Sequence, residues 1–241
     1  MSNVWWIAKR EIASYLRSPA GYIIICAVLV LDGLLFNAFA IGSGAKKSSE
    51  VLEAFFYFSS GSILVGSVFV SMRLIAEERQ TGTFTLLATS PIREWQLVLG
   101  KYLSAVAFLS VMTALTLYMP LLVMVNGKVS LGHILAGYLG LLLLGGAAVA
   151  LGLIASALSP NQLVAAVLGA TMIVIFLLLW LLSRIASPPL DDLVAYLSIH
   201  DKHFRPFMRG IVSVQDVLFY LSLIYVALLV ATRVVEARRW R

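Results

Sequence analysis

The hydrophobic residues of this chain form long unbroken runs rather than the one-sided stripe of a helix on a soluble protein. Each run is roughly 20 residues long, which is the length that crosses a hydrocarbon core of about 30 Å. We place six spans at about residues 20–41, 54–75, 102–124, 131–157, 162–184 and 214–234. Strand-length segments of alternating polarity, typical of a membrane β-barrel, are absent. The pattern therefore predicts an all-α polytopic membrane protein with six transmembrane helices, built as a single transmembrane domain over residues 1–241.

The N-terminal segment, residues 1–18, is too polar to span a membrane. One face of a helix here collects five apolar or aromatic residues: Trp5, Ala8, Ile12, Tyr15 and Leu16. We expect an interfacial elbow helix with its Trp and Tyr side chains at headgroup depth. Ser18 then fits an N-cap for the first span, because Pro19 follows it at the first helical position.

The connections between the third and sixth spans are of two kinds. One short turn joins spans three and four at residues 126–128, and a second joins spans four and five at Ser159. We predict that Ser159 caps the fifth span in a capping box with Gln162. A similar cap at Ser213 with Asp216 is expected for span six. The longer loop at 185–213 repeats apolar residues at helical spacing, so part of it is expected to associate with the outer membrane surface or to dip back into the membrane; these are Leu190, Leu193, Val194 and Leu197.

Composition and charge agree with a membrane protein. The chain is 61% hydrophobic and 12% charged, against about 25% charged in soluble domains. The net charge of +6 comes from basic residues that flank the spans instead of gathering on one face, so we exclude nucleic acid as a partner. Eleven Lys and Arg residues fall on the side of the two termini and seven on the other. This excess predicts cytoplasmic termini in a bacterial inner membrane.

The segment 76–101 is a long charged interruption between two spans and is predicted to be cytoplasmic. Glu77, Glu78 and Arg79 form a charged helical end outside the lipid. Gly82 allows a sharp reversal of the chain, because glycine has no Cβ. A helix is expected to restart at Ser90-Pro91 and to run into the third span. Such a segment suits either a coupling element that docks on a soluble partner or an ordinary solvated loop.

The string Glu77-Glu78-x-x-x-Gly82-Thr83-x-x-x-Leu87-x-x-x-Pro91, ending at Gly100-Lys101, resembles the signature of ABC-2-type transporter permeases. The closest likeness is to the branch of the gliding-motility protein GldF and the nitrous-oxide-associated protein NosY. The resemblance implies that this segment contacts a partner ATPase through Glu77, Glu78, Arg79, Gly82, Thr83, Phe84 and Pro91.

The resemblance also implies a non-catalytic permease that moves a substrate, by family default outward, in two six-span subunits with a cytoplasmic ABC ATPase dimer. The second permease copy is expected to make a homodimer, although a related permease or a GldG-like auxiliary membrane subunit is compatible. The chain has no GxxxxGK[ST] phosphate loop, since Gly100-Lys101 lacks the upstream glycine. We therefore expect no cofactor in this chain, with ATP and Mg bound by the partner. Two alternatives stay open: a non-transporting subunit that passes ATPase strokes to an envelope machine, and an intramembrane lipid-modifying enzyme.

Few polar residues lie inside the spans, and this mildly favours a lipidic or amphipathic cargo. Asp32 lies in the first span, where a carboxylate costs roughly 2.5–3.5 kcal/mol on insertion scales and usually faces protein or water. A substrate path is predicted from Asp32 and Asn37 with Ser62 and Ser67 of the second span; a polar brace between helices is the alternative. Small residues at four-residue spacing in the fourth span, Ala148, Gly152 and Ser156, predict close helix packing.

Two histidines in the long outer loop, His200 and His203, flank Asp201. Two histidines and one acid are a weak metal signal even with His133 nearby, because zinc sites need further positioned ligands. We expect no metal site and interpret the segment as a polar surface cap on the bundle. The single cysteine, Cys26, lies within the first span and is interpreted as a small residue facing lipid or another helix.

Overall fold

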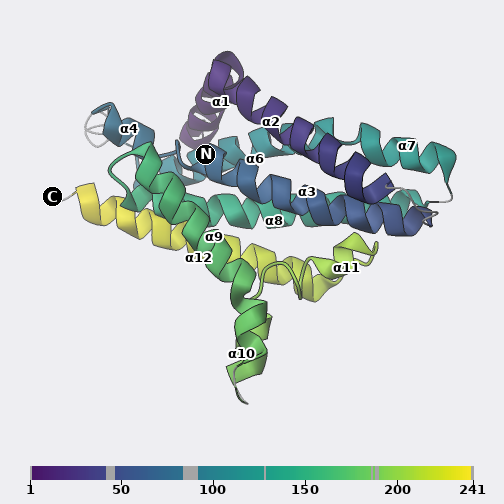
Figure 1. The fold of residues 1–241 in the computed structure, drawn as a ribbon. Coiled ribbons are helices and arrows are strands. Elements are labelled where there is room, and N and C mark those ends of the chain that lie inside the picture. Colours follow the sequence, from purple (N-terminus) through teal and green to yellow (C-terminus); the bar gives the residue numbers. More distant parts are fainter. Residues whose placement is uncertain are drawn as a thin grey trace.

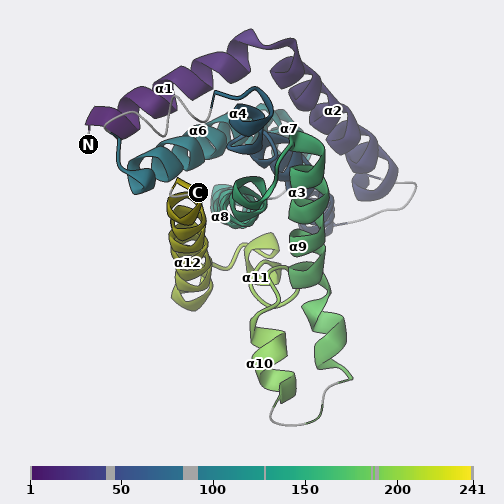
Figure 2. The same ribbon diagram turned by 90° about the vertical axis from the view of Figure 1, so that its left-hand side faces the viewer.

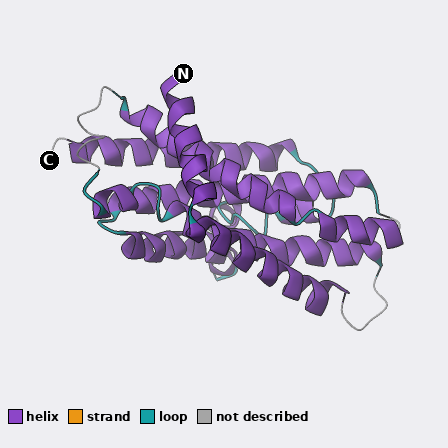
Figure 3. Ribbon diagram, turned by 90° about the horizontal axis from the view of Figure 1, so that it is seen from above, coloured by secondary structure: helices purple, strands orange, loops and turns teal. Residues whose placement is uncertain are grey.

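The computed structural model describes residues 2–41, 47–83, 92–127, 129–185, 187 and 190–239, and all regular structure within these residues is helical (Figures 1 and 3). The helices are α1 (Ser2–Arg17), α2 (Pro19–Leu35), the π-helix η1 (Phe36–Ile41), α3 (Ser48–Ser71), α4 (Ala76–Gln80), α6 (Glu94–Leu115), α7 (Tyr118–Asn126), α8 (Leu131–Leu158), α9 (Gln162–Ser183), α10 (Leu190–Tyr196), α11 (Arg205–Met208) and α12 (Val214–Arg239).

Six helical stretches of the described chain are long and apolar enough to cross a membrane, which confirms the predicted fold class. They are Pro19–Phe39, Ser48–Gln80, Glu94–Val125, Leu131–Leu158, Gln162–Ser183 and Val214–Arg238. The second and third begin earlier than predicted, at Ser48 and Glu94 instead of residues 54 and 102. Hydropathy detects only the lipid-facing part of a helix, whereas the hydrogen-bonded helix continues into polar residues beyond it.

Helix α8 is the centre of the bundle. Seen along its axis in Figure 2, α8 is surrounded by α3, α6, α9 and α12. Glycines let the neighbouring helices approach closely. The Phe56 ring occupies the position that a Cβ on Gly137 would take, and the Ser71 side chain occupies the position that a Cβ on Gly152 would take. The predicted close packing around Gly152 and Ser156 is thus confirmed.

Helix α1 packs along α6, and part of its predicted apolar face is buried against the bundle. Ala8 and Tyr15 are buried, while Trp5 remains exposed. The Tyr15 hydroxyl donates to the carbonyl of Val70 at 3.1 Å, and its ring stacks on Phe108. Tyr15 therefore binds other helices of the bundle, and its placement at headgroup depth stays a prediction. The predicted cap is confirmed at Ser18, whose Oγ accepts from the amide of Ala20.

The third span is interrupted between α6 and α7. Pro120 has no N–H to donate to the carbonyl of Thr116 four residues earlier, and this weakens the helix at that point. The Thr116 hydroxyl donates to the Thr113 carbonyl at 2.7 Å and shares a hydrogen bond of 2.9 Å with the hydroxyl of Tyr138. The break is thus held against α8 by a buried polar contact.

The predicted cap of the fifth span lies two residues too early. Asn161 is the N-cap of α9, since its side chain accepts from the amide of Val164 at 2.9 Å. Ser159 instead turns back to α8, where its hydroxyl donates to the Ala155 carbonyl at 2.7 Å. Asp216, expected to help cap the sixth span, binds the side chain of His203.

The loop at 185–213 contains two short helices. In α10, Leu190 and Leu193 are exposed on a helix, as their spacing predicted. The following segment folds back onto α8 and α3, and Phe204 and Phe207 are fully buried there. Part of the loop therefore belongs to the core of the bundle.

Candidate partner-coupling site

Helix α4 is held in place by a hydroxyl group of the central helix. After α3 ends, residues 72–75 form a turn that leaves backbone groups without helical partners. Ser156 of α8 satisfies three of them: its hydroxyl donates to the carbonyl of Met72 at 3.2 Å and accepts from the amides of Ile75 and Ala76, each at 3.0 Å. The start of α4 is therefore fixed to α8.

A buried charge cluster joins α4 to α1 and α6. The ammonium group of Lys101, whose side chain is 2% exposed, lies 2.8 Å from a carboxylate oxygen of Glu78 and 3.3 Å from one of Glu11. Arg10 contacts the same two carboxylates at 3.7 Å and 2.9 Å. A charge removed from water is stable only when it is paired, so this arrangement fixes three helices relative to one another.

The charges around Glu11 favour its ionised form. Burial alone raises the pKa of the Glu11 carboxyl, but the charges of Lys101 and Arg10 outweigh burial, and the pKa lies below its usual value. Glu11 is therefore a carboxylate at neutral pH and remains available to Lys101.

The other polar residues of α4 bind the start of α9 and the end of α8. Arg79 donates to the carbonyl of Ser159 at 3.2 Å, and the side chain of Gln80 accepts from the amide of Gln162 at 3.3 Å. Arg238, near the end of α12, donates to the carbonyl of Leu158 at 2.7 Å. Figure 1 shows α4 and the C-terminus at the same end of the bundle, which we call the α4 end.

The structure places the predicted coupling residues in different environments. Glu77 is half-exposed and forms an ion pair of 2.9 Å with Arg73, whereas Glu78 and Arg79 are turned toward other helices of the same chain. Gly82 has a φ of 74°, so the predicted reversal is present, and Thr83 is exposed beside it. Phe84 and Pro91 lie outside the described residues. A contact of any of these residues with a partner stays a prediction.

The four residues of the predicted substrate path do not line one polar channel within the described chain. Asp32 is buried, and the hydroxyls of Ser59 and Ser62 lie close to its carboxyl group. Asn37 is exposed on η1, and Ser67 donates to the Leu64 carbonyl of its own helix. Ser62 lines an apolar groove of about 290 Å³ between α2 and α3. The substrate role of all four stays a prediction.

The two outer histidines differ from the expected surface cap. His203 is buried: its Nδ1 lies 2.7 Å from a carboxylate oxygen of Asp216, and its Nε2 lies 2.8 Å from the carbonyl of Tyr196. A carbonyl only accepts, so Nε2 carries the proton that it shares with Tyr196. His200 instead bonds the hydroxyl of Ser60 at 2.9 Å. The described His, Cys, Asp and Glu side chains contain no group of three that would hold a metal ion, and Cys26 is exposed.

The sequence alone did not indicate that Lys101, Glu11 and Ser156 belong to this site. Lys101 offered a signal, because a lysine so close to an apolar span requires either water or an acid. The identity of that acid depends on how α1 and α4 meet α6, and no spacing along the chain reveals it.

The family model of the ABC-2 type transporter matches residues 2–181, which include the elbow helix, α4 and the first five spans. No curated protein matches the chain. Proteins of this family are non-catalytic transmembrane subunits whose ATPase is a separate chain. The chain therefore belongs to the ABC-2 type transporter family and is the transmembrane permease component of an ABC transporter.

Proposed function

We propose that this permease exports its substrate across the bacterial inner membrane and receives the work of ATP hydrolysis at the α4 end. The observation that carries the proposal is the anchoring of α4 by side-chain contacts to α1, α6, α8 and α9. A partner that pushes on a flexible loop moves only that loop. A partner that pushes on α4 moves helices that belong to the transmembrane bundle.

The charge distribution supports a cytoplasmic α4 end. The C-terminus lies there, and with six spans both termini share one side of the membrane. The excess of Lys and Arg on that side agrees with the positive-inside rule. ATP is available in the cytoplasm, so an ATPase dimer docking there completes the machine, with two permease copies matching the two ATPases. The finer likeness to the GldF and NosY branch makes a GldG-like auxiliary subunit a compatible further partner.

The docking surface is proposed at the exposed face of α4 and the turn that follows it, rather than at the buried Glu78. Glu77 carries the test, because it is half-exposed and its substitution leaves the contacts of Lys101 in place. Glu236 on α12 is a matched control: it is also a surface glutamate paired with a nearby arginine, at 2.9 Å from Arg233.

The experiment is affinity purification of the complex from membranes, followed by measurement of the ATPase rate with and without the permease. We expect Glu77→Lys to lower the stimulated ATPase rate and ATPase retention, and Glu236→Lys to leave both unchanged. Normal retention and stimulation in Glu77→Lys would contradict docking at this face. Stimulated hydrolysis without cargo movement in vesicles would instead favour a subunit that passes mechanical strokes to an envelope machine.

Asp32 is proposed to line the substrate path. Its carboxyl group is buried inside a span beside the hydroxyls of Ser59 and Ser62, and acidic residues at such positions usually face protein or a water-filled path. Asp32→Leu should lower transport while the stimulated ATPase rate persists. Unchanged transport in this variant removes Asp32 from the path and leaves it a structural brace.

A further inference from the structure

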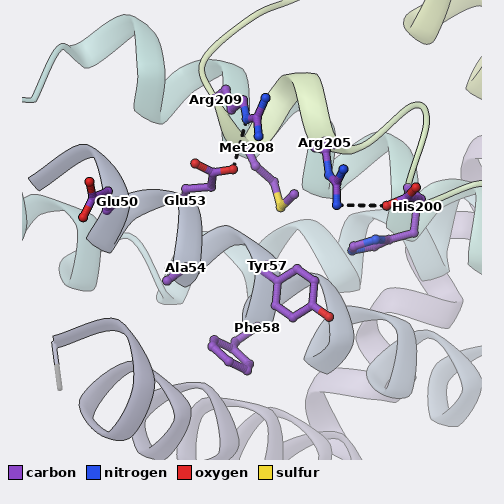
Figure 4. A pocket seen from close by; sticks show the side chains of 10 residues that line it. Glu50, Glu53, Ala54, Tyr57, Phe58, His200, Arg205, Met208 and Arg209 are labelled. Carbon is purple, nitrogen blue, oxygen red and sulfur yellow. Dashed lines mark hydrogen bonds and ion pairs between the residues drawn. The ribbon is translucent and has the colours of Figure 1, made fainter. Parts of the chain in front are cut away.

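Two recesses share one wall where α3 meets the segment 198–209. Tyr57, His200, Asp201 and Arg205 line both. Figure 4 shows the first recess, in which both arginines are paired: Arg209 with Glu53 at 3.1 Å, and Arg205 with Asp201 at 3.2 Å. The second recess, of about 360 Å³, lies on the other side of this wall, between α3 and α9.

The second recess is amphipathic. Its apolar part is formed by Gly61 and Leu64 of α3 with Leu177 and Trp180 of α9, and its polar rim by Ser60, His200, Arg184, Asp201 and Arg205. A Cβ on Gly61 would meet no atom within 4 Å, so the absence of a side chain there leaves open space. The volume is in the range of small-ligand sites, about 300–1,000 Å³.

The rim carries an excess of positive charge. The guanidinium of Arg184 lies over the Trp180 ring at 4.7 Å, and no carboxylate of the described residues lies within ion-pair distance of it. Arg205 is balanced by Asp201. Burial lowers the pKa of His200, so its ring is neutral at neutral pH and shares a hydrogen bond with Ser60. Arg184 is therefore the cation of the rim that lacks a counter-charge.

We propose that this recess binds an anionic phospholipid, with the phosphate of the headgroup at Arg184 and the upper part of an acyl chain along Leu64 and Leu177. Guanidinium groups bind phosphate through a planar fork of N–H donors. Trp side chains favour the membrane–water interface. Trp180 lies in the last turn of α9, at the end of the fifth span. A free phosphate would leave the apolar half of the recess unused. The site does not depend on the transport role proposed above.

Native mass spectrometry of the full chain, released in detergent with the partners it retains, tests the proposal. The protein is titrated with phosphatidylglycerol and, separately, with phosphatidylcholine of the same acyl chains. Both lipids carry a phosphodiester, but the choline ammonium cancels its charge in phosphatidylcholine, whereas phosphatidylglycerol keeps a net negative charge to balance Arg184. We therefore expect phosphatidylglycerol to bind about tenfold tighter, which corresponds to about 1.4 kcal/mol. Arg184→Gln should reduce this preference to the phosphatidylcholine level, while Arg233→Gln on the exposed face of α12 should keep it.

A steric variant separates the recess from nonspecific charge. Gly61→Phe fills the open space and should abolish saturable phosphatidylglycerol binding. Gly132→Phe is the matched control, because a Cβ on Gly132 also meets no atom within 4 Å, and it should bind as the unmodified chain does. Equal affinity for both lipids, or wild-type binding by Gly61→Phe, would overturn the proposal. Displacement of the lipid by an equal concentration of soluble glycerol phosphate would likewise overturn the claim that a lipid is the ligand.

Discussion

Replacement of Lys101 by methionine tests whether the buried charge cluster stabilises the α4 end. The change keeps most of the side-chain volume and removes the charge that Glu78 and Glu11 share. At an effective dielectric constant of about 20, two charges 2.8 Å apart attract by ~6 kcal/mol. Desolvation of both groups offsets part of this, and breaking a buried pair by removing one partner costs about 3–5 kcal/mol in measured cases.

The lower end of that range is expected here. Arg10 remains 2.9 Å from Glu11 and 3.7 Å from Glu78, and therefore compensates part of the lost charge. A loss of about 3 kcal/mol corresponds to a fall in Tm of roughly 6–12 °C for a chain of this size. The control is Arg233→Met, which removes an exposed ion pair worth about 0.2–1 kcal/mol.

Thermal unfolding of the purified protein in detergent, followed by intrinsic fluorescence, measures both variants. The double variant Lys101→Met with Glu78→Gln should recover a large part of the loss, because it removes one of the two uncompensated carboxylates. The reasoning is refuted if Lys101→Met unfolds within about 3 °C of Arg233→Met. It is equally refuted if the double variant is less stable than Lys101→Met, since the loss would then not come from unpaired charge.

Three further predictions use the same unfolding assay. Ser156→Ala should cost about 2–4 kcal/mol, because it leaves two buried amides without an acceptor; a loss no larger than in Ser110→Ala, whose hydroxyl bonds only its own helix, would contradict this. Gly137→Val should cost at least about 1–3 kcal/mol by overlap with Phe56, and normal stability would show that α8 and α3 separate readily. Burial lowers the pKa of His200 below its ordinary value of 6.5, so the unfolded chain binds the proton more tightly and stability falls as pH drops through this range. His200→Gln should therefore lose less stability than the unmodified chain between about pH 7.5 and about pH 5, and an identical pH dependence would rule this out.

The six spans and the elbow helix were predictable because both depend on local composition. A run of apolar residues reports its own length, and Ser18 before Pro19 is a capping signal contained in two neighbouring residues. The choice between Ser159 and Asn161 was not predictable in this way. Both residues precede the same helix, and the backbone path around Pro160 decides which side chain reaches the free amide.

The contacts of the candidate site could not be derived from spacing. Lys101 and Glu11 are 90 residues apart, and Ser156 is about 80 residues from the amides that it accepts from. His203 was expected in a polar surface cap and Asp216 in the cap of the sixth span, whereas their pairing depends on how the segment before α12 folds back toward that helix. Hydropathy indicates which residues leave the lipid, but the partner of a buried polar group is set by tertiary packing.

The three hydrogen bonds of Ser156 join the short segment at the start of α4 to the much longer helix α8. Moving α4 together with the turn before it would break all three bonds in a buried place, so a push on this segment is expected to tilt α8 as well. A helix of 28 residues is about 42 Å long, and a tilt of about 5° displaces its far end by about 3–4 Å. Displacements of that size alter which side chains pack together at the opposite membrane surface, although no residue at that surface contacts ATP.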